Sequence, residues 1–167
     1  KSAAIFMGSN DFKYAKWMTK LSPVALASWH IPHFSVSIIT NDRPWSLNRL
    51  FQSLKSSVFF GDKVPISINV ESTADDDTLK LVESFKEKWE ARGRVSTAFR
   101  VLRAGLIRAV TESYYPNDRH HHCVLLEDDI EVSPLFFAWI KYTTLTYQYG
   151  EKSDFAPNMY GVSLYTP

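Results

Sequence analysis

The residues with the clearest chemical potential are four carboxylates that stand close together in the sequence: Glu127, Asp128, Asp129 and Glu131. They follow directly on the apolar residues 124–126. Two like charges about 5 Å apart repel by roughly 3 kcal/mol at an effective dielectric constant near 20. Such crowding therefore requires a compensating cation or raised pKa values. Carboxylate oxygens are hard ligands, and a few of them favour Mg²⁺ or Mn²⁺ bridging a diphosphate over a closed structural site.

A simpler reading is an acidic turn in water that only starts the next helix, where a helix dipole favours anions. The apolar run before the acids and their density favour the metal site instead. Glu131 is the weakest of the four candidate ligands, because its carboxylate can simply interact with the start of the next helix.

The elements that must position these acids begin with two strand–turn–helix units. Residues 34–40 alternate like a strand, and Pro44 suits the first turn of a helix. Residues 64–70 predict a second strand, after which Thr73 is expected to cap a helix with Asp75, Asp76 and Asp77 in its first turn. Apolar residues at helical spacing support both helices: Leu47, Leu50, Phe51 and Leu54 in the first, and Leu79, Val82, Phe85 and Trp89 in the second.

The pattern continues less sharply along the rest of the chain. We expect a third strand at residues 94–97, and then a helix from Ala98 to about Tyr115. Residues 122–126 predict a short buried strand, Ser133 and Pro134 start another helix, and residues 160–165 read as a closing strand. Residues 1–33 are expected to form an irregular or partly helical lead-in segment.

Strands alternating with helices predict an α/β fold with an open, mainly parallel sheet and helices on both faces. Ligands of such sheets bind beyond the carboxyl ends of the strands. The acids after residues 124–126 lie at that edge, together with the polar residues that follow the first two strands.

Composition narrows the class of function. The chain has 167 residues with 19 basic and 18 acidic side chains, and this balance argues against nucleic-acid binding. The single cysteine, Cys123, excludes an internal disulfide and a Cys-rich zinc site, and its apolar neighbours favour a packed thiol over a nucleophile. The longest apolar run, residues 135–140, is too short to span a membrane. The chain starts with Lys1, so we expect it to be part of something longer, with any signal or anchor outside it.

Residues 124–137 resemble the metal-motif region of N-acetylglucosaminyltransferase I and related enzymes. Those are GT-A-fold glycosyltransferases with a Glu-Asp-Asp version of the Asp-x-Asp motif. A looser resemblance, from Phe34 to the end, is to plant and fungal family-2-like glycosyltransferases. It implies a GT-A, nucleotide-diphospho-sugar transferase-like fold, with residues 34–167 as the nucleotide-sugar-binding half of a larger catalytic domain.

The resemblance also implies roles for single residues. Asp129 would bind the metal ion, Mn²⁺ or Mg²⁺, while Asp128 and Glu127 would contact the ribose or hold that ligand. Arg43 resembles the arginine after the first strand that lines the nucleotide pocket.

Other positions on the same rim follow from the resemblance or from the residues themselves. Glu71 occupies the place of an aspartate that reads the uracil ring, and its extra methylene leaves the base open. Thr40 and Asp42 lie on the same rim. Among Arg100, Arg103 and Arg108, which could point at phosphates, Arg103 beside Gly105 is the first to test.

The hypothesis is transfer of a sugar from a nucleoside diphosphate donor, with UDP expected, to a glycan, protein or lipid hydroxyl. The resemblance points to the Golgi or endoplasmic reticulum lumen. No catalytic base is identified, because in the resembling enzymes it comes from a later part of the chain. Two alternatives stay open: an inactive glycosyltransferase-like domain kept for binding or structure, and a Mg²⁺-dependent phosphoryl-transfer domain. His120, His121 and His122 are expected at the opposite end of their strand, away from the acids.

Overall fold

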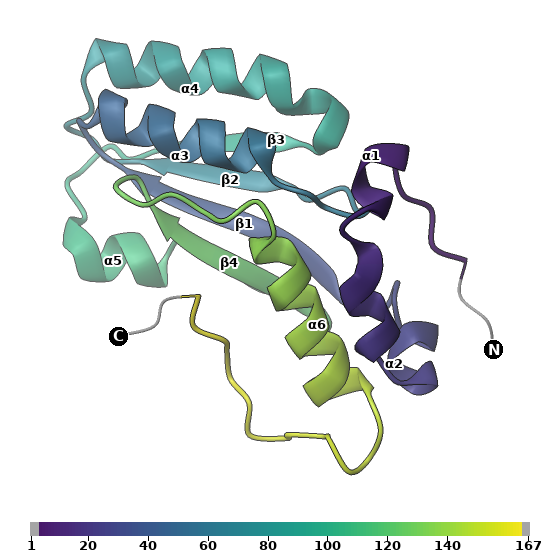
Figure 1. Cartoon of the computed structure of the whole chain (residues 1–167). Coiled ribbons are helices and arrows are strands. Elements are labelled where there is room, and N and C mark those ends of the chain that lie inside the picture. Colours follow the sequence, from purple (N-terminus) through teal and green to yellow (C-terminus); the bar gives the residue numbers. More distant parts are fainter. Residues whose placement is uncertain (1–3, 165–167) are drawn as a thin grey trace. The chain divides into compact units, whose positions relative to one another are not determined.

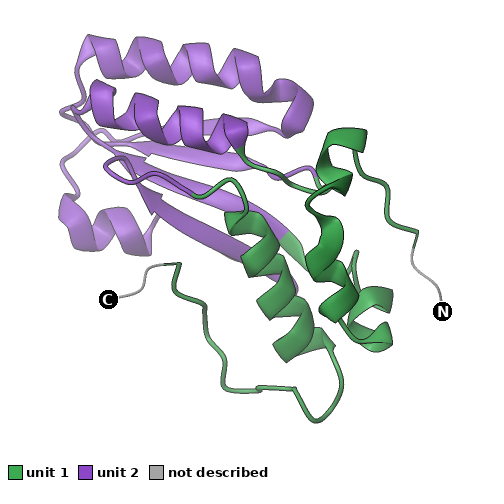
Figure 2. Ribbon diagram, in the orientation of Figure 1, with its two compact units in different colours: residues 1–33, 57–62, 133–167 green, residues 34–56, 63–132 purple. Residues whose placement is uncertain are grey.

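The computed structural model describes residues 4–164. It contains two compact units (Figure 2). Unit 1 takes in residues 1–33, 57–62 and 133–167, and unit 2 takes in residues 34–56 and 63–132. The four carboxylates all belong to unit 2.

Unit 2 is built on a parallel sheet with the strand order β3-β2-β1-β4. Its strands are β1 (His33–Thr40), β2 (Ile66–Val70), β3 (Val95–Phe99) and β4 (His121–Glu127). Helices α3 and α4 lie over one face and α5 over the other (Figure 1). Their bounds, with one short 3-10 helix, are α3 (Pro44–Ser56), α4 (Asp76–Trp89), η2 (Glu90–Arg92) and α5 (Gly105–Thr111). The predicted α/β fold class is confirmed.

The strand register decides which residues meet at the carboxyl edge. Thr40 at the end of β1 pairs with Val70 at the end of β2, and the N–H of Glu71 donates to the carbonyl of Thr40 at 2.9 Å. The side chains that follow the two strands therefore start level with each other.

Apolar packing between α3 and α4 fixes one face of the sheet. All four predicted core residues of α3 are buried, and the Phe51 ring stacks on the Phe85 ring with 3.8 Å between centroids. Burying one such side chain stabilises the fold by roughly 1.5–3 kcal/mol. On α4 the stripe consists of Thr78, Val82, Phe85 and Trp89, whereas Leu79 is only partly buried.

The helix expected from Ala98 was predicted wrongly, because β3 continues to Phe99 and α5 begins only at Gly105. Ladder pairing prevails over helical spacing here: Phe99 pairs with Val70, and the N–H of Arg100 donates to the carbonyl of Val70. Leu102 is 81% exposed and does not form part of a buried stripe.

The helix cap predicted at Thr73 was also wrong. Asp75 caps α4, and its carboxylate accepts from the N–H of Thr78 at 2.8 Å. The hydroxyl of Thr73 instead donates to the side-chain carbonyl of Asn41 at 2.7 Å. Helix α6 (Phe136–Tyr149) follows Leu135, whose own side chain makes no cap, and the hydroxyl of Ser133 accepts from the N–H of Leu135 at 3.3 Å, as expected of a helix start at Ser133.

Unit 1 is helical and is held by aromatic packing. The lead-in forms α1 (Ser9–Phe12), the 3-10 helix η1 (Ala15–Lys20) and α2 (Pro23–Ala27), which confirms a partly helical segment. The side chain of Lys141 on α6 is only 1% exposed, and its ammonium donates to the carboxylate of Asp62. That ammonium also lies 4.0 Å from the ring centroid of Trp29.

The strand expected at residues 160–165 is not formed at residues 160–164, and Tyr165 lies outside the described residues. Tyr160 is 99% exposed, so this segment buries no apolar face that would hold it as a strand. Within residues 4–164, the helices are too short or too polar to cross a membrane.

Candidate ligand site at the carboxyl ends of the strands

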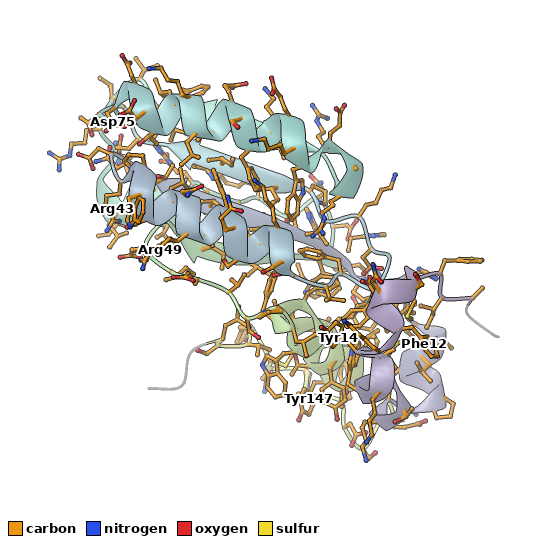
Figure 3. The ribbon with its side chains drawn as sticks, turned by 45° about the horizontal axis from the view of Figure 1, so that its top comes forward. Phe12, Tyr14, Arg43, Arg49, Asp75 and Tyr147 are labelled. Atoms are coloured by element: carbon orange, nitrogen blue, oxygen red, sulfur yellow. The ribbon has the colours of Figure 1, made fainter. Side chains whose placement is uncertain are left out.

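A cleft of about 200 Å³ lies where β1, β2 and β4 end, beside the start of α5. Six residues singled out from the sequence line it: Thr40, Arg43, Glu71, Arg103, Glu127 and Asp128. Figure 3 shows Arg43 at this end of unit 2, where α3 and α4 begin. Asp42 and Asp129 are exposed beside the cleft but are not among its lining residues.

Asp128 is the buried centre of the site, with a fully buried side chain one residue beyond β4. One oxygen, Oδ2, accepts from the Thr40 hydroxyl at 2.8 Å and from the Asn41 N–H at 3.3 Å. The other, Oδ1, lies 2.6 Å from Nη2 of Arg43, an ion pair without the alignment of a hydrogen bond. Burying a carboxylate is tolerated only when partners of this kind surround it.

Arg43 joins two of the carboxylates. Besides Asp128 it reaches Asp129, whose Oδ2 lies 3.2 Å from Nη1. The side chains of Arg43 and Asp129 are 50% and 48% exposed, so this second contact adds little stability. The cation that the crowded acids require is thus supplied, at least in part, by the chain itself.

The oxygens open to a metal ion are those of Glu127 and Asp129, both exposed. Among residues 4–164 no three His, Cys, Asp or Glu side chains converge on one point. Mg²⁺ and Mn²⁺ are commonly held by one or two carboxylates, with substrate phosphates and water completing the shell. The residues present fit a site of that kind, completed by a diphosphate, and do not fit a closed metal cage. Glu131 lies 3.5 Å from Arg49 of α3 and serves a surface ion pair.

Glu71 binds the chain on both of its carboxylate oxygens. Oε1 accepts from the N–H and hydroxyl of Ser72 at 2.8 and 3.2 Å, and Oε2 accepts from the N–H of Ala104 at 3.0 Å. These donors lower the pKa of Glu71 below its usual 4.5, with the N–H of Ser72 as the largest cause and burial acting against it. Glu71 therefore stays ionised beside the cleft.

The three arginines considered for phosphate binding, Arg100, Arg103 and Arg108, have different surroundings. Arg103 lines the cleft, whereas Arg100 pairs with Glu112 at 2.7 Å and also donates to the carbonyl of Arg108. Sequence reasoning missed the five other lining residues: Ile39, Asn41, Gly105, Leu106 and Ala109. The available signal was the position of Ile39 and Asn41 on either side of Thr40, because the other three residues depend on where α5 begins.

The histidines and the cysteine lie away from the cleft. His121 and His122 begin β4, while Glu127 ends it. Burial lowers the pKa of His122 and raises the pKa of the Cys123 thiol. A neutral imidazole and a protonated thiol suit packing, as predicted for Cys123.

Comparison with known proteins decides the family. Residues 45–162 match the family described as SPBC1E8.03c C-terminal domain, which covers more than half of the chain. The chain belongs to this family. A search of curated proteins finds no match to the chain.

Solved structures share the fold at low sequence identity. The mannosyltransferase PcManGT from Pyrobaculum calidifontis, in complex with GDP-Man and Mn²⁺, is 13% identical and has a TM-score of 0.55. The match covers 81% of this chain and 38% of that one. S. aureus TarS 1-349 in complex with UDP is 14% identical with a TM-score of 0.52, over 67% of this chain and 32% of that one. The chain thus has a glycosyltransferase-like fold and spans about a third of the length of these two proteins.

Proposed function

We propose that the chain carries the donor-binding half of a metal-dependent glycosyltransferase, which transfers a sugar from a nucleoside diphosphate to a hydroxyl acceptor on a glycan, protein or lipid. The observation behind this proposal is the cleft at the carboxyl ends of β1, β2 and β4, where Arg43, Arg103 and Asp128 meet. The ligands in the titles of the similar structures, UDP in one and GDP-Man with Mn²⁺ in the other, support it.

The two guanidinium groups of the cleft suit a diphosphate. Arg43 and Arg103 are the cationic side chains among its described lining residues, and guanidinium groups bind phosphate oxygens through paired N–H donors. Asp128 holds Arg43 by its 2.6 Å ion pair, so that the guanidinium is oriented before the ligand arrives. The hydroxyl of Thr40 and the carboxylates of Asp42 and Glu127 offer hydrogen-bonding groups to a ribose on the same rim.

Asp129 would hold Mn²⁺ or Mg²⁺, whose chemistry is to neutralise the charge that develops on the leaving diphosphate. Because Arg43 already contacts both Asp128 and Asp129, we expect the chain to bind the metal weakly in the absence of nucleotide. Activation of the acceptor hydroxyl also needs a general base, which we do not assign to any residue of this chain. Donor binding is therefore the property to measure.

Calorimetry with UDP and with GDP, each with and without Mn²⁺, tests the proposal. Replacing Arg43 with alanine should weaken nucleotide binding roughly 10- to 100-fold, as expected for the loss of one charge-assisted hydrogen bond. Asp129→Ala should abolish the gain in affinity that Mn²⁺ provides. Arg94→Ala is the matched control, because it removes the same charge just before β3, at the other end of the strand, and should leave binding unchanged.

Each result has a clear reading. Equal losses in Arg43→Ala and Arg94→Ala would mean that charge alone, and not the cleft, attracts the nucleotide. No binding of either nucleotide by the parent chain would reject the donor site and favour a glycosyltransferase-like domain kept for structure.

A further inference from the structure

The chain itself takes most of the acceptor capacity of Glu71. An ionised carboxylate offers about four acceptor sites. Ser72 donates to Oε1 twice and Ala104 donates to Oε2, while the N–H of Gly105 adds to the donors that lower the pKa of Glu71. A group that reads the edge of a base needs an acceptor directed into the cleft, and Glu71 directs its oxygens at the chain.

The donors on one side of Glu71 belong to the start of α5. Ala104 is the residue before the helix, and its own side chain cannot cap it. The first N–H groups of any helix lack partners within the helix. Glu71 supplies the acceptor from a position 33 residues earlier in the chain, at the end of β2.

This anchor matters because the segment before α5 is otherwise open. Val101 and Leu102 are 91% and 81% exposed. The other anchor lies before them at Arg100, through its N–H to Val70 and its ion pair with Glu112. Between the two anchors stands Arg103, and directly after them come Gly105 and Leu106, all three of which line the cleft.

We propose that Glu71 is a positioning residue that fixes the Arg103 loop and the start of α5 as one wall of the donor cleft, and that it does not read the base. The proposal rests on the donor-binding function proposed above. Its consequence is that Glu71 acts on every nucleoside diphosphate alike, so loss of the carboxylate weakens binding without changing the preference for one base over another.

Glu71→Asp separates positioning from base reading. Aspartate keeps the charge and is the residue that the resembling enzymes carry at this place, so a base reader would bind as well as or better than the parent. A side chain one methylene shorter cannot keep the bond to Ala104 while it also binds Ser72. Positioning therefore predicts that Glu71→Asp weakens UDP and GDP binding by the same factor, about tenfold, as does Glu71→Ala.

Hydrogen exchange of the ligand-free chain gives a readout that does not depend on binding. In both Glu71 variants the amides of Ala104 and Gly105 should exchange at least tenfold faster, while that of Ile68 in the sheet keeps its rate. Glu83→Gln removes an exposed carboxylate of α4 that does not line the cleft, and serves as the control for charge.

The outcomes distinguish this proposal from the donor function. Unchanged exchange at Ala104, or a loss of affinity for one nucleotide only, overturns the positioning role. If the parent chain binds no nucleotide but exchange still quickens in the variants, the anchoring of α5 is supported and only the donor function fails.

Discussion

The chain contains two ion pairs that bury opposite partners. In unit 2 the buried partner is the carboxylate of Asp128, and Arg43 is half exposed. In unit 1 the buried partner is the ammonium of Lys141, with Asp62 at 21% exposure. The two pairs therefore differ in which charged side chain is exposed and able to contact a ligand.

The surroundings of the two buried groups explain this difference. Asp128 keeps hydrogen bonds from Thr40 and Asn41 even if Arg43 turns away. Lys141 lies over the rings of Trp29 and Phe137, at 4.0 and 5.9 Å from their centroids. A cation held in this way contributes to packing as well as charge. The unit 1 pair is thus enclosed by aromatic packing, and the unit 2 pair leaves an arginine available for binding.

The largest expected effect is on the unit 1 pair. Lys141→Ala should lower the free energy of unfolding by about 3 kcal/mol or more, because it leaves a cavity under the aromatic rings and removes the partner of Asp62. Urea unfolding followed by tryptophan fluorescence measures this loss. Lys141→Met, which keeps most of the volume, should lose distinctly less, and a loss below about 0.5 kcal/mol in the alanine variant would refute the structural role.

Arg43→Ala should change stability little and nucleotide affinity strongly. Because Asp128 keeps two donors and Arg43 is half exposed, we expect a stability loss of only about 1 kcal/mol. The same variant should lose nucleotide affinity far more strongly, as proposed above, whereas Lys141→Met should bind nucleotide like the parent. Unfolding midpoints measured beside binding constants would contradict the comparison if Arg43→Ala were the less stable of the two alanine variants.

Much of unit 2 was predictable because its sequence repeats one simple pattern. Residues 34–56 alternate and then show helical spacing, and the structure contains β1 followed by α3. The acids after residues 124–126 were placed at the carboxyl edge by a rule about parallel sheets, and Asp128 does lie there. Local pattern was sufficient wherever one strand or helix buries its own apolar face.

The errors fall where distant residues decide the structure. The start of α5 depends on the pairing of β3 with β2 and on Glu71, which stands 33 residues before Ala104. The contacts of Arg43 also depend on distant residues, because its ion-pair partners Asp128 and Asp129 lie 85 and 86 residues later in the sequence. No pattern within one segment carries that information, so the sequence indicated which residues gather at the edge but not which of them bind one another.

The smallest expected effect is a dependence on pH that only the unit 1 pair should show under alkaline conditions. Burial lowers the pKa of Lys141 below its usual 10.5, against the opposing effect of Asp62. Between the lowered value and 10.5 the unfolded chain binds more protons than the folded one, so the free energy of unfolding should rise with pH. Lys141→Met should lack this rise, whereas Arg43→Ala should keep it, since arginine does not titrate in this range. Urea midpoints of the three proteins, collected through the alkaline window, test this, and parallel curves for the parent and Lys141→Met would mean that the buried ammonium costs the fold nothing.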